Sequence, residues 1–262
     1  NIRRSGGQRR ERPVRREWEE FRLAGAFLTV FPVAKGISME PERLGRSMGL
    51  FPAVGLTVGL GLVVLNWALA PLIPRAVLDC LLILILITVT GGLHLDGIAD
   101  LIDGLAGGKD REGVLRIMKD SRVGAMGVVG LVMVLLLKYL SLYNVPLAEK
   151  SAALIFMPAA GRWIQVTLAY FCPYVRAEVG TGGAFVDHVG EREVLLAAVT
   201  LVLAGLILFG ARGILLVALL TLAAWGLVRY FRFRLGGVTG DVLGAATEVI
   251  EVLTLLLVLG LY

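Results

Sequence analysis

The chain has 262 residues, of which 57% are hydrophobic and 18% charged, and its formal net charge is +5. Soluble domains are about 45–50% apolar, and the long uncharged blocks found here exclude an ordinary water-soluble fold. The two cysteines, Cys80 and Cys172, do not indicate a disulfide framework. The basic excess lies beside a membrane domain, so it indicates anionic lipid headgroups rather than nucleic acid.

The N-terminal segment carries most of that basic excess, with seven arginines among the first sixteen residues. We expect residues 1–20 to be a disordered basic extension and residues 21–262 to form a single membrane-embedded catalytic domain. The apolar run over residues 23–34 is shorter than the roughly 20 residues that a spanning helix needs, and it contains Pro32. It therefore predicts a short interfacial or re-entrant segment.

Seven further apolar blocks follow, and most of them are long enough to cross a bilayer as a helix. They cover residues 48–70, 77–93, 123–145, 151–175, 194–211, 213–228 and 242–262. Lys138 lies inside the third block, where we expect its side chain to snorkel outward. The pattern predicts an all-α fold, a polytopic integral membrane bundle of about seven transmembrane helices.

Twenty-one of the 26 Lys and Arg residues fall on one side of this arrangement. The positive-inside rule then places the N-terminus and the polar loops in the cytoplasm and the C-terminus outside. The loops that follow the second, fourth and sixth spans are long and polar, and one of them carries Asp187 and His188. The outer loops are short, so we expect the functional site at the inner surface.

The loop after the second span carries Asp96, Asp100 and Asp103 at i, i+4 and i+7, which share one face of a helix. Clustered carboxylates repel one another unless a cation lies among them. Ligands that offer only oxygen favour Mg²⁺, Mn²⁺ or Ca²⁺. The alternative is a solvated acidic face, but such a face gains nothing from the glycines at 97, 104, 107 and 108, which weaken a helix.

Basic residues follow directly, and together with a bound metal they suit a diphosphate. The candidates for substrate binding are Lys109, Arg116, Lys119 and Arg122. The positive-inside rule alone also explains basic residues in this loop. His94 is a candidate as a base, a metal ligand or a substrate contact, and an interfacial residue with satisfied hydrogen bonds is the favoured reading.

A second constellation near the C-terminus places Asp241, Glu248 and Glu251 on one helical face. Carboxylates at membrane depth are costly and usually functional, and Arg162 in the fourth span is their expected partner. These residues either contribute to the substrate site or form a structural ion pair. Thr239 or Asp241 caps the helix, whose exposed amides offer a phosphate site.

Four sequence blocks resemble the cobalamin synthase (adenosylcobinamide-GDP ribazoletransferase) family. They read "FLTVFPV" from Phe27, "GLFPAVGLTVG" from Gly49, "GGLHLDGIADLIDGLAGGKDREGVLRIMKDSRVGAMGVV" from Gly91 and "LGGVTGDVLGAATEVIE" from Leu235. The resemblance implies a bacterial inner-membrane enzyme that uses Mg²⁺, with Mn²⁺ as an alternative. It further implies that the enzyme joins adenosylcobinamide-GDP to alpha-ribazole, or to its 5'-phosphate, and releases GMP.

This reaction agrees with the acidic loop, because phosphoryl transfer depends mainly on positioning and charge neutralisation. Asp96, Asp100 and Asp103 are therefore the candidate catalytic and metal-binding residues, one of them accepting the hydroxyl proton. Two alternatives stay open. One is a phosphotransferase of the CDP-alcohol type, whose "DG-x-x-A-R" pattern is broken here by Asp100 and Leu101. The other is a membrane transporter, and the oligomeric state is also open.

Overall fold

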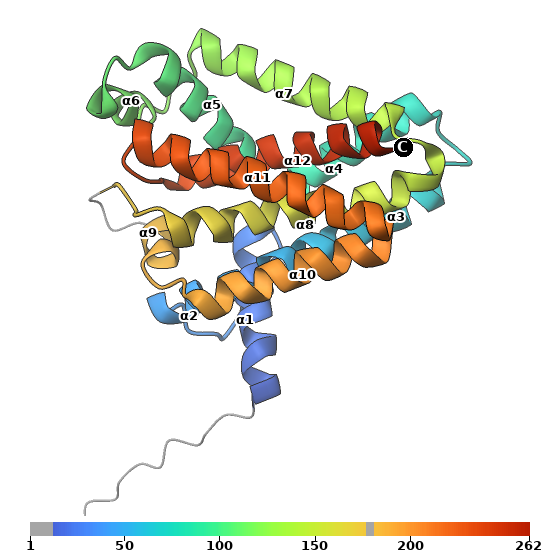
Figure 1. The fold of residues 1–262 in the computed structure, drawn as a ribbon, viewed down its shortest axis with the longest axis horizontal. Helices are drawn as coiled ribbons and strands as arrows, with labels where there is room; N and C mark the ends of the chain where they lie inside the picture. The colour runs from blue at the N-terminus through green and yellow to red at the C-terminus, as the bar shows by residue number, and fades with distance from the viewer. Residues whose placement is uncertain (1–12, 177–180) are drawn as a thin grey trace, which may run out of the picture.

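The computed structural model describes residues 13–176 and 181–262, and within them the fold is helical. The helices are α1 Pro13–Leu28, α2 Pro41–Ser47, η1 Met48–Leu50, α3 Phe51–Leu69, α4 Arg75–Val89, α5 Leu93–Gly107, α6 Arg111–Ile117, α7 Ala125–Asn144, α8 Leu147–Phe171, α9 Thr181–Val186, α10 Glu191–Phe209, α11 Ala211–Arg234 and α12 Gly240–Leu261. The prediction of an all-α bundle is confirmed (Figure 1).

The N-terminal helix begins earlier than expected. Residues 13–20, assigned from sequence to a disordered extension, form the first two turns of α1, while residues 1–12 lie outside the described residues. Within α1, Arg16 donates to Glu20 at 3.0 Å, and Glu19 receives Arg43 of α2 at 2.5 Å. These ion pairs within and beyond the helix stabilise a segment whose composition alone favours disorder.

Six helices in the described residues are long and apolar enough to cross a membrane, or up to seven if α4 and α5 count as one broken span. The predicted second span, over residues 77–93, is not one straight helix. α4 ends at Val89, and the chain bends by 90° into α5. Gly91 and Gly92 have φ angles of +62° and +69°, which side chains rarely tolerate, so this glycine pair allows the bend.

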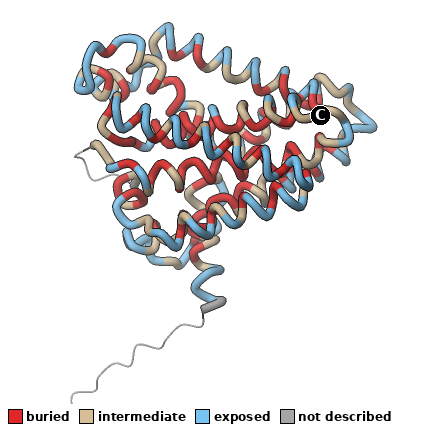
Figure 2. The backbone as a smooth tube through the Cα atoms, viewed as in Figure 1, coloured by how far each residue is buried: buried red, intermediate tan, exposed pale blue. Residues whose placement is uncertain are grey.

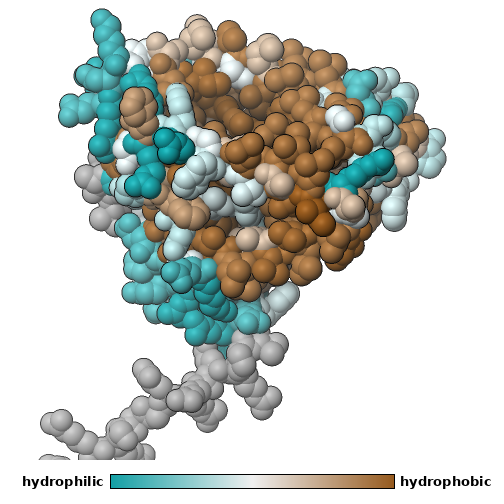
Figure 3. Space-filling model, in the orientation of Figure 1, coloured by the Kyte–Doolittle hydropathy of each residue, from teal (hydrophilic) through white to brown (hydrophobic). Residues whose placement is uncertain are grey.

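α8 is the central helix of the bundle, packed between α3 and α12. Buried positions cover 89% of its most apolar window, against about a third or less for α7, α10 and α11 (Figure 2). Apolar side chains dominate the outer surface and form a broad belt between polar ends (Figure 3). In water such a surface is unfavourable, so the belt is the lipid-facing surface of a membrane protein.

The short helices α2, α6 and α9 gather at one end of the bundle, and the C-terminus lies at the other (Figure 1). The polar loops expected on one side therefore do meet at one end. Cys80 is exposed and Cys172 is buried, and both are free thiols, as the sequence predicts.

Candidate functional site

A pocket of about 280 Å³ lies at this polar end, among the first turns of α5 and α12, the segment after α8, and the helices η1 and α9. Its polar lining comprises His94, Asp96, Gln165, Tyr174, Arg176 and Asp241. Its apolar lining includes Phe27, Met48, Phe51, Phe185 and Leu243. It thus combines titratable groups with an aromatic wall, which is typical of a small-molecule site.

The pocket exists because α5 and α12 approach each other closely. A Cβ atom on Gly97 of α5 would lie 2.5 Å from the carbonyl oxygen of Asp241, and one on Gly244 of α12 would lie 3.2 Å from Cα of His94. Only glycine permits the closer of these contacts. The glycines of the acidic loop are therefore packing residues, and they bring Asp96 next to Asp241 from the far end of the sequence.

The carboxylates of this region are poorly neutralised by the protein. Asp96 is exposed and Asp100 is half-buried, and Asp100 lies within electrostatic range of Asp96 and Asp241. Neither Asp96 nor Asp100 forms an ion pair with a described residue, whereas Asp241 receives Arg176 at 2.5 Å. Three carboxylates thus share one guanidinium, and the group has an excess of negative charge.

Asp103, the third residue of the predicted acidic face, has a different environment. Its two carboxylate oxygens accept backbone N–H groups of Gly124 and Gly127, at 2.6 and 2.7 Å. A Cβ atom on Gly127 would lie 2.3 Å from Asp103 Oδ2, so glycine is required there. Asp103 therefore caps the start of α7, and its negative charge stabilises the helix N-terminus.

No group of three Asp, Glu, His or Cys side chains among the described residues is closely enough placed to form a metal site as it stands. The chemistry of the donor set still suits a hard cation, because Asp96, Asp100 and Asp241 offer only oxygen. Asp103 fits such a set less well, because each of its oxygens already accepts a hydrogen bond.

Sequence reasoning missed Arg176 and Tyr174, which both line the pocket. Arg176 donates to Asp241 and, at 3.2 Å, to the carbonyl oxygen of Met118, so it links α12 to the end of α6. Burial raises the pKa of the Tyr174 phenol. For Arg176 the available signal was its position in a polar loop of the predicted inner face, whereas Tyr174 falls within the predicted fourth span. Asp187 and His188 in the same loop as Arg176 are exposed and do not line the pocket.

His94 is buried, and one of its two ring nitrogens has a hydrogen-bond partner among the described residues. Its Nε2 lies 3.0 Å from Gln165 Nε2, and Gln165 Nε2 also donates to Thr247 Oγ1 at 2.8 Å. This chain of polar contacts joins the pocket to the interior of α12. His94 and Gln165 both line the pocket as well.

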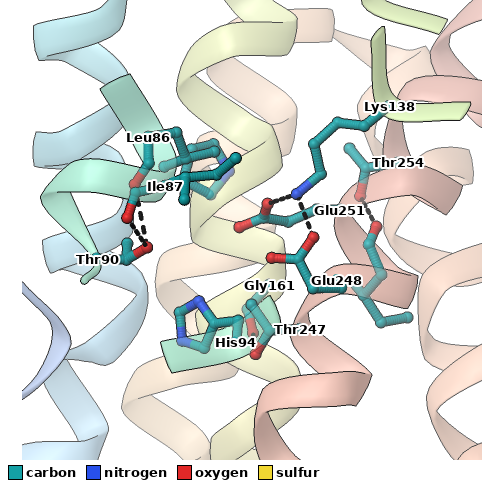
Figure 4. A network of polar contacts seen from close by, with 12 residues as sticks. Leu86, Ile87, Thr90, His94, Lys138, Gly161, Thr247, Glu248, Glu251 and Thr254 are labelled. Carbon is teal, nitrogen blue, oxygen red and sulfur yellow. Dashed lines mark hydrogen bonds and ion pairs between the residues drawn. The ribbon is translucent and has the colours of Figure 1, made fainter. Parts of the chain in front are cut away.

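Deeper in the bundle, two cations and two anions form a buried charge cluster: Lys138, Arg162, Glu248 and Glu251. Figure 4 shows the contacts of Lys138 with the two glutamates. Lys138 Nζ contacts Glu248 at 2.6 Å and Glu251 at 2.7 Å, and Arg162 pairs with Glu251. Two expectations are corrected here. Lys138 points inward rather than snorkelling, and the partner of Glu248 is Lys138 rather than Arg162.

This cluster lies outside the pocket, because none of its four side chains lines that cavity. The sequence predicts Arg162 and Glu248 in the substrate site. Neither side chain lines the pocket, so each contacts it only through intervening residues. Thr239 is also buried, and its hydroxyl accepts the N–H of Val242 at 3.2 Å as the cap of α12. Asp241, in contrast, lines the pocket as predicted.

The basic candidates of the acidic loop also lie outside the pocket lining; they are Lys109, Arg116, Lys119 and Arg122. All four are exposed at the polar end of the bundle. Arg122 contacts Asp120 at 2.7 Å, and its guanidinium lowers the pKa of that carboxyl to about 2. The four side chains therefore form a basic rim near the site rather than its wall.

Comparison with known proteins gives a consistent result over nearly the whole chain. The Cobalamin-5-phosphate synthase family model matches residues 20–259. A protein of Geotalea daltonii named adenosylcobinamide-GDP ribazoletransferase is 44% identical over 234 residues, which cover 89% of this chain and 94% of the relative. Proteins of the same name from Desulforamulus reducens and Pseudomonas fluorescens are 40% and 42% identical, over 92% and 90% of this chain and 96% and 97% of theirs. No solved structure matches significantly.

Proposed function

The chain belongs to the Cobalamin-5-phosphate synthase family, and from this premise we infer that it is a membrane-embedded adenosylcobinamide-GDP ribazoletransferase. It is an enzyme of cobalamin biosynthesis that joins adenosylcobinamide-GDP to ribazole. We propose that the acceptor is alpha-ribazole or its 5'-phosphate and that GMP is the second product.

The observation that supports this assignment most directly is that Asp96, Asp241 and Arg176 line one pocket, with Asp100 within electrostatic range of all three. In the proposed reaction, a ribose hydroxyl oxygen attacks the phosphorus that carries the cobinamide arm. The new P–O bond forms as the P–O bond to GMP breaks, and a carboxylate takes the hydroxyl proton. Arg176 is suited to bind the diphosphate, because a guanidinium pairs with phosphate oxygens in a fixed fork geometry.

We further propose that the enzyme uses Mg²⁺, or Mn²⁺ in its place, held by Asp96 and Asp100 with Asp241. A bound divalent cation would neutralise charge on the diphosphate. The net negative charge of these three carboxylates supports this proposal. One guanidinium neutralises only part of that charge, and one divalent cation would balance the rest. Asp103 supports the site from outside, by fixing α7 against α5.

The assay for this function measures GMP release from adenosylcobinamide-GDP by the purified protein in liposomes, with alpha-ribazole and its 5'-phosphate tested separately. We expect GMP and the joined product in equal amounts, and only when both substrates are present. GMP release without an acceptor would indicate a hydrolase instead. Full activity after removal of divalent cations with EDTA would contradict the metal proposal and leave the transferase assignment intact.

We propose that the enzyme resides in the bacterial inner membrane with the pocket on the cytoplasmic side, supported by the charge bias of its loops. In a background without Cys80 and Cys172, Ser121→Cys marks the pocket end and Leu72→Cys marks the opposite end; both parent residues are exposed. In intact cells, an impermeant thiol reagent should label the variant at 72 and spare the variant at 121. The reverse pattern would invert the orientation.

A further inference from the structure

The two walls of the pocket differ in chemistry. One wall is formed by three phenylalanine rings from separate helices: Phe27 of α1, Phe51 of α3 and Phe185 of α9. The centroids of Phe27 and Phe185 lie 4.2 Å apart, and Phe51 lies 5.7 Å from Phe185. Aromatic rings pack favourably against another flat ring, in stacked or edge-to-face arrangements. This wall therefore suits a flat, apolar ligand.

The polar part of the lining includes His94 and Gln165. The contacts of Gln165 show which ring nitrogen of His94 carries the proton. Thr247 has one hydroxyl proton, and its hydroxyl donates to the backbone carbonyl of Leu243 at 2.9 Å or of Gly161 at 3.1 Å. Thr247 Oγ1 must therefore accept from Gln165, and only the amide nitrogen of Gln165 can donate. This contact fixes the orientation of the Gln165 amide.

The same amide nitrogen faces His94 Nε2 at 3.0 Å. Since Gln165 donates there too, Nε2 must be the unprotonated nitrogen, and the ring proton of neutral His94 is on Nδ1. Within the described residues, Nδ1 has no hydrogen-bond partner, and His94 lines the pocket. His94 thus offers the pocket an N–H donor.

We propose that this pocket is the subsite for the base of alpha-ribazole, an inference that rests on the transferase assignment above. The base is a flat dimethylbenzimidazole with a single unprotonated ring nitrogen and no polar exocyclic group. The wall of Phe27, Phe51 and Phe185 contacts its rings, and His94 Nδ1–H donates to the ring nitrogen. Gln165 is a positioning residue that holds His94 in this tautomer, and the ribose is directed toward Asp96 and Asp241.

The other candidate occupants suit the pocket less well. Guanine carries a carbonyl, an amide and an amino group, and against the phenylalanine wall these would lose their hydrogen bonds to water without replacement. A corrinoid macrocycle is much larger than a pocket of about 280 Å³, which is near the lower limit for small-molecule sites. The nucleotide and the corrinoid are therefore expected to bind outside, toward the exposed carboxylates and the basic rim.

The first test compares two conservative changes by steady-state kinetics with both natural substrates. Phe27→Leu shortens the aromatic wall at a half-buried position, and Phe156→Leu removes a ring that packs on Phe209, away from the pocket. We expect Phe27→Leu to raise KM for alpha-ribazole about 10-fold while KM for adenosylcobinamide-GDP stays within 2-fold. Phe156→Leu should change neither KM. A rise for adenosylcobinamide-GDP alone, for both substrates, or for neither would overturn the assignment.

The second test measures equilibrium binding of alpha-ribazole and of the matching indole riboside, in which a C–H replaces the ring nitrogen. The wild type should bind the indole riboside about 10-fold more weakly, because the His94 donor then lacks an acceptor. Gln165→Glu puts an oxygen opposite His94 Nε2 and draws the ring proton there, so this variant should bind both ligands equally. Equal binding by the wild type would refute the donor role. Absence of GMP release by the wild type would instead refute the transferase assignment itself.

Discussion

Two groups of acidic residues on helices, similar in sequence, have opposite electrostatic situations. In the buried charge cluster, Glu248 and Glu251 are matched by Lys138 and Arg162, and every member is nearly inaccessible. Near the pocket, Asp96, Asp100 and Asp241 have a single cationic partner among the described residues. That partner is Arg176, which pairs with Asp241. The first group is balanced within the protein, and the second is not.

The difference separates structural charge from functional charge. A carboxylate at membrane depth costs several kcal/mol unless a cation lies beside it, so the balanced cluster fixes α7, α8 and α12 together. A partly exposed group with excess negative charge instead has spare capacity to bind a cation and a substrate. Five predictions test this contrast, beginning with the largest expected effect.

Asp100→Asn removes one charge from the unbalanced group and preserves the size of the side chain. We expect kcat to fall at least about 100-fold, because a group that acts on the transferred phosphoryl is lost. The melting temperature should stay the same or rise, because repulsion from Asp96 and Asp241 is relieved. GMP release and thermal unfolding of the same preparation measure both quantities. Near-normal turnover by the folded variant would remove Asp100 from the catalytic group.

Glu251→Gln should act in the opposite way, mainly on stability. Glu251 contacts both Lys138 and Arg162, so its loss leaves the Arg162 guanidinium buried without a carboxylate. We expect a loss of roughly 3–5 kcal/mol in stability, measured by unfolding in detergent. Glu248→Gln is the matched control and should cost less, because Lys138 keeps Glu251 as a partner. Equal losses would indicate that the two carboxylates share the cations evenly.

A double change refines this comparison. The Lys138→Met and Glu248→Gln changes, made together, should destabilise the protein less than the two single effects added, because Lys138→Met strands Glu248 and the second change then removes that stranded carboxylate. Arg162→Met with Glu248→Gln should show weaker coupling, since those two side chains are linked only through Glu251 and Lys138. Strong coupling between Arg162 and Glu248 would contradict the observed pairing.

Asp103→Asn tests whether the third aspartate belongs with the pocket group or with the fold. Each carboxylate oxygen of Asp103 accepts one N–H group, from Gly124 or Gly127. In asparagine an NH₂ group replaces one of these oxygens and cannot accept, so one of the two hydrogen bonds is lost. We expect a loss of about 1 kcal/mol in stability, the usual scale for a lost helix cap. The KM for Mg²⁺ should stay within a few-fold of wild type. A large rise in that KM at unchanged stability would place Asp103 among the metal ligands.

The smallest effect is expected at a partly exposed ion pair at the protein surface, Glu19 with Arg43. The Arg43 guanidinium lowers the pKa of Glu19 below its ordinary value of 4.5. Because the folded-state pKa is lowered, the stabilisation is present above pH 4.5 and is lost as the pH falls through the lowered pKa. Solvent screening limits it to under about 0.5 kcal/mol. Hydrogen exchange in α1 should therefore rise slightly in acid, and Arg43→Met should abolish that change.

The sequence by itself determined most of the long membrane helices, since apolar blocks of about 20 residues have few alternatives in a bilayer. It also placed Asp96 and Asp100 on a common face, because a spacing of four residues fixes that relation within one helix. The family followed from contiguous motifs, above all the block from Gly91, which needs no knowledge of packing. Each of these properties is local in the chain.

The tertiary structure decided which side chains meet. Lys138 and Glu248 are 110 residues apart, and their pairing depends on the relative depth and rotation of α7 and α12, which periodicity within either helix does not specify. The same holds for Gln165 and His94, which lie 71 residues apart, and for Arg176 and Asp241, which lie 65 apart. Asp103 accepts two backbone amides because α7 starts beside it, and the spacing of the three aspartates does not reveal that contact. A periodic pattern reveals the face of a helix, but only packing determines what that face contacts.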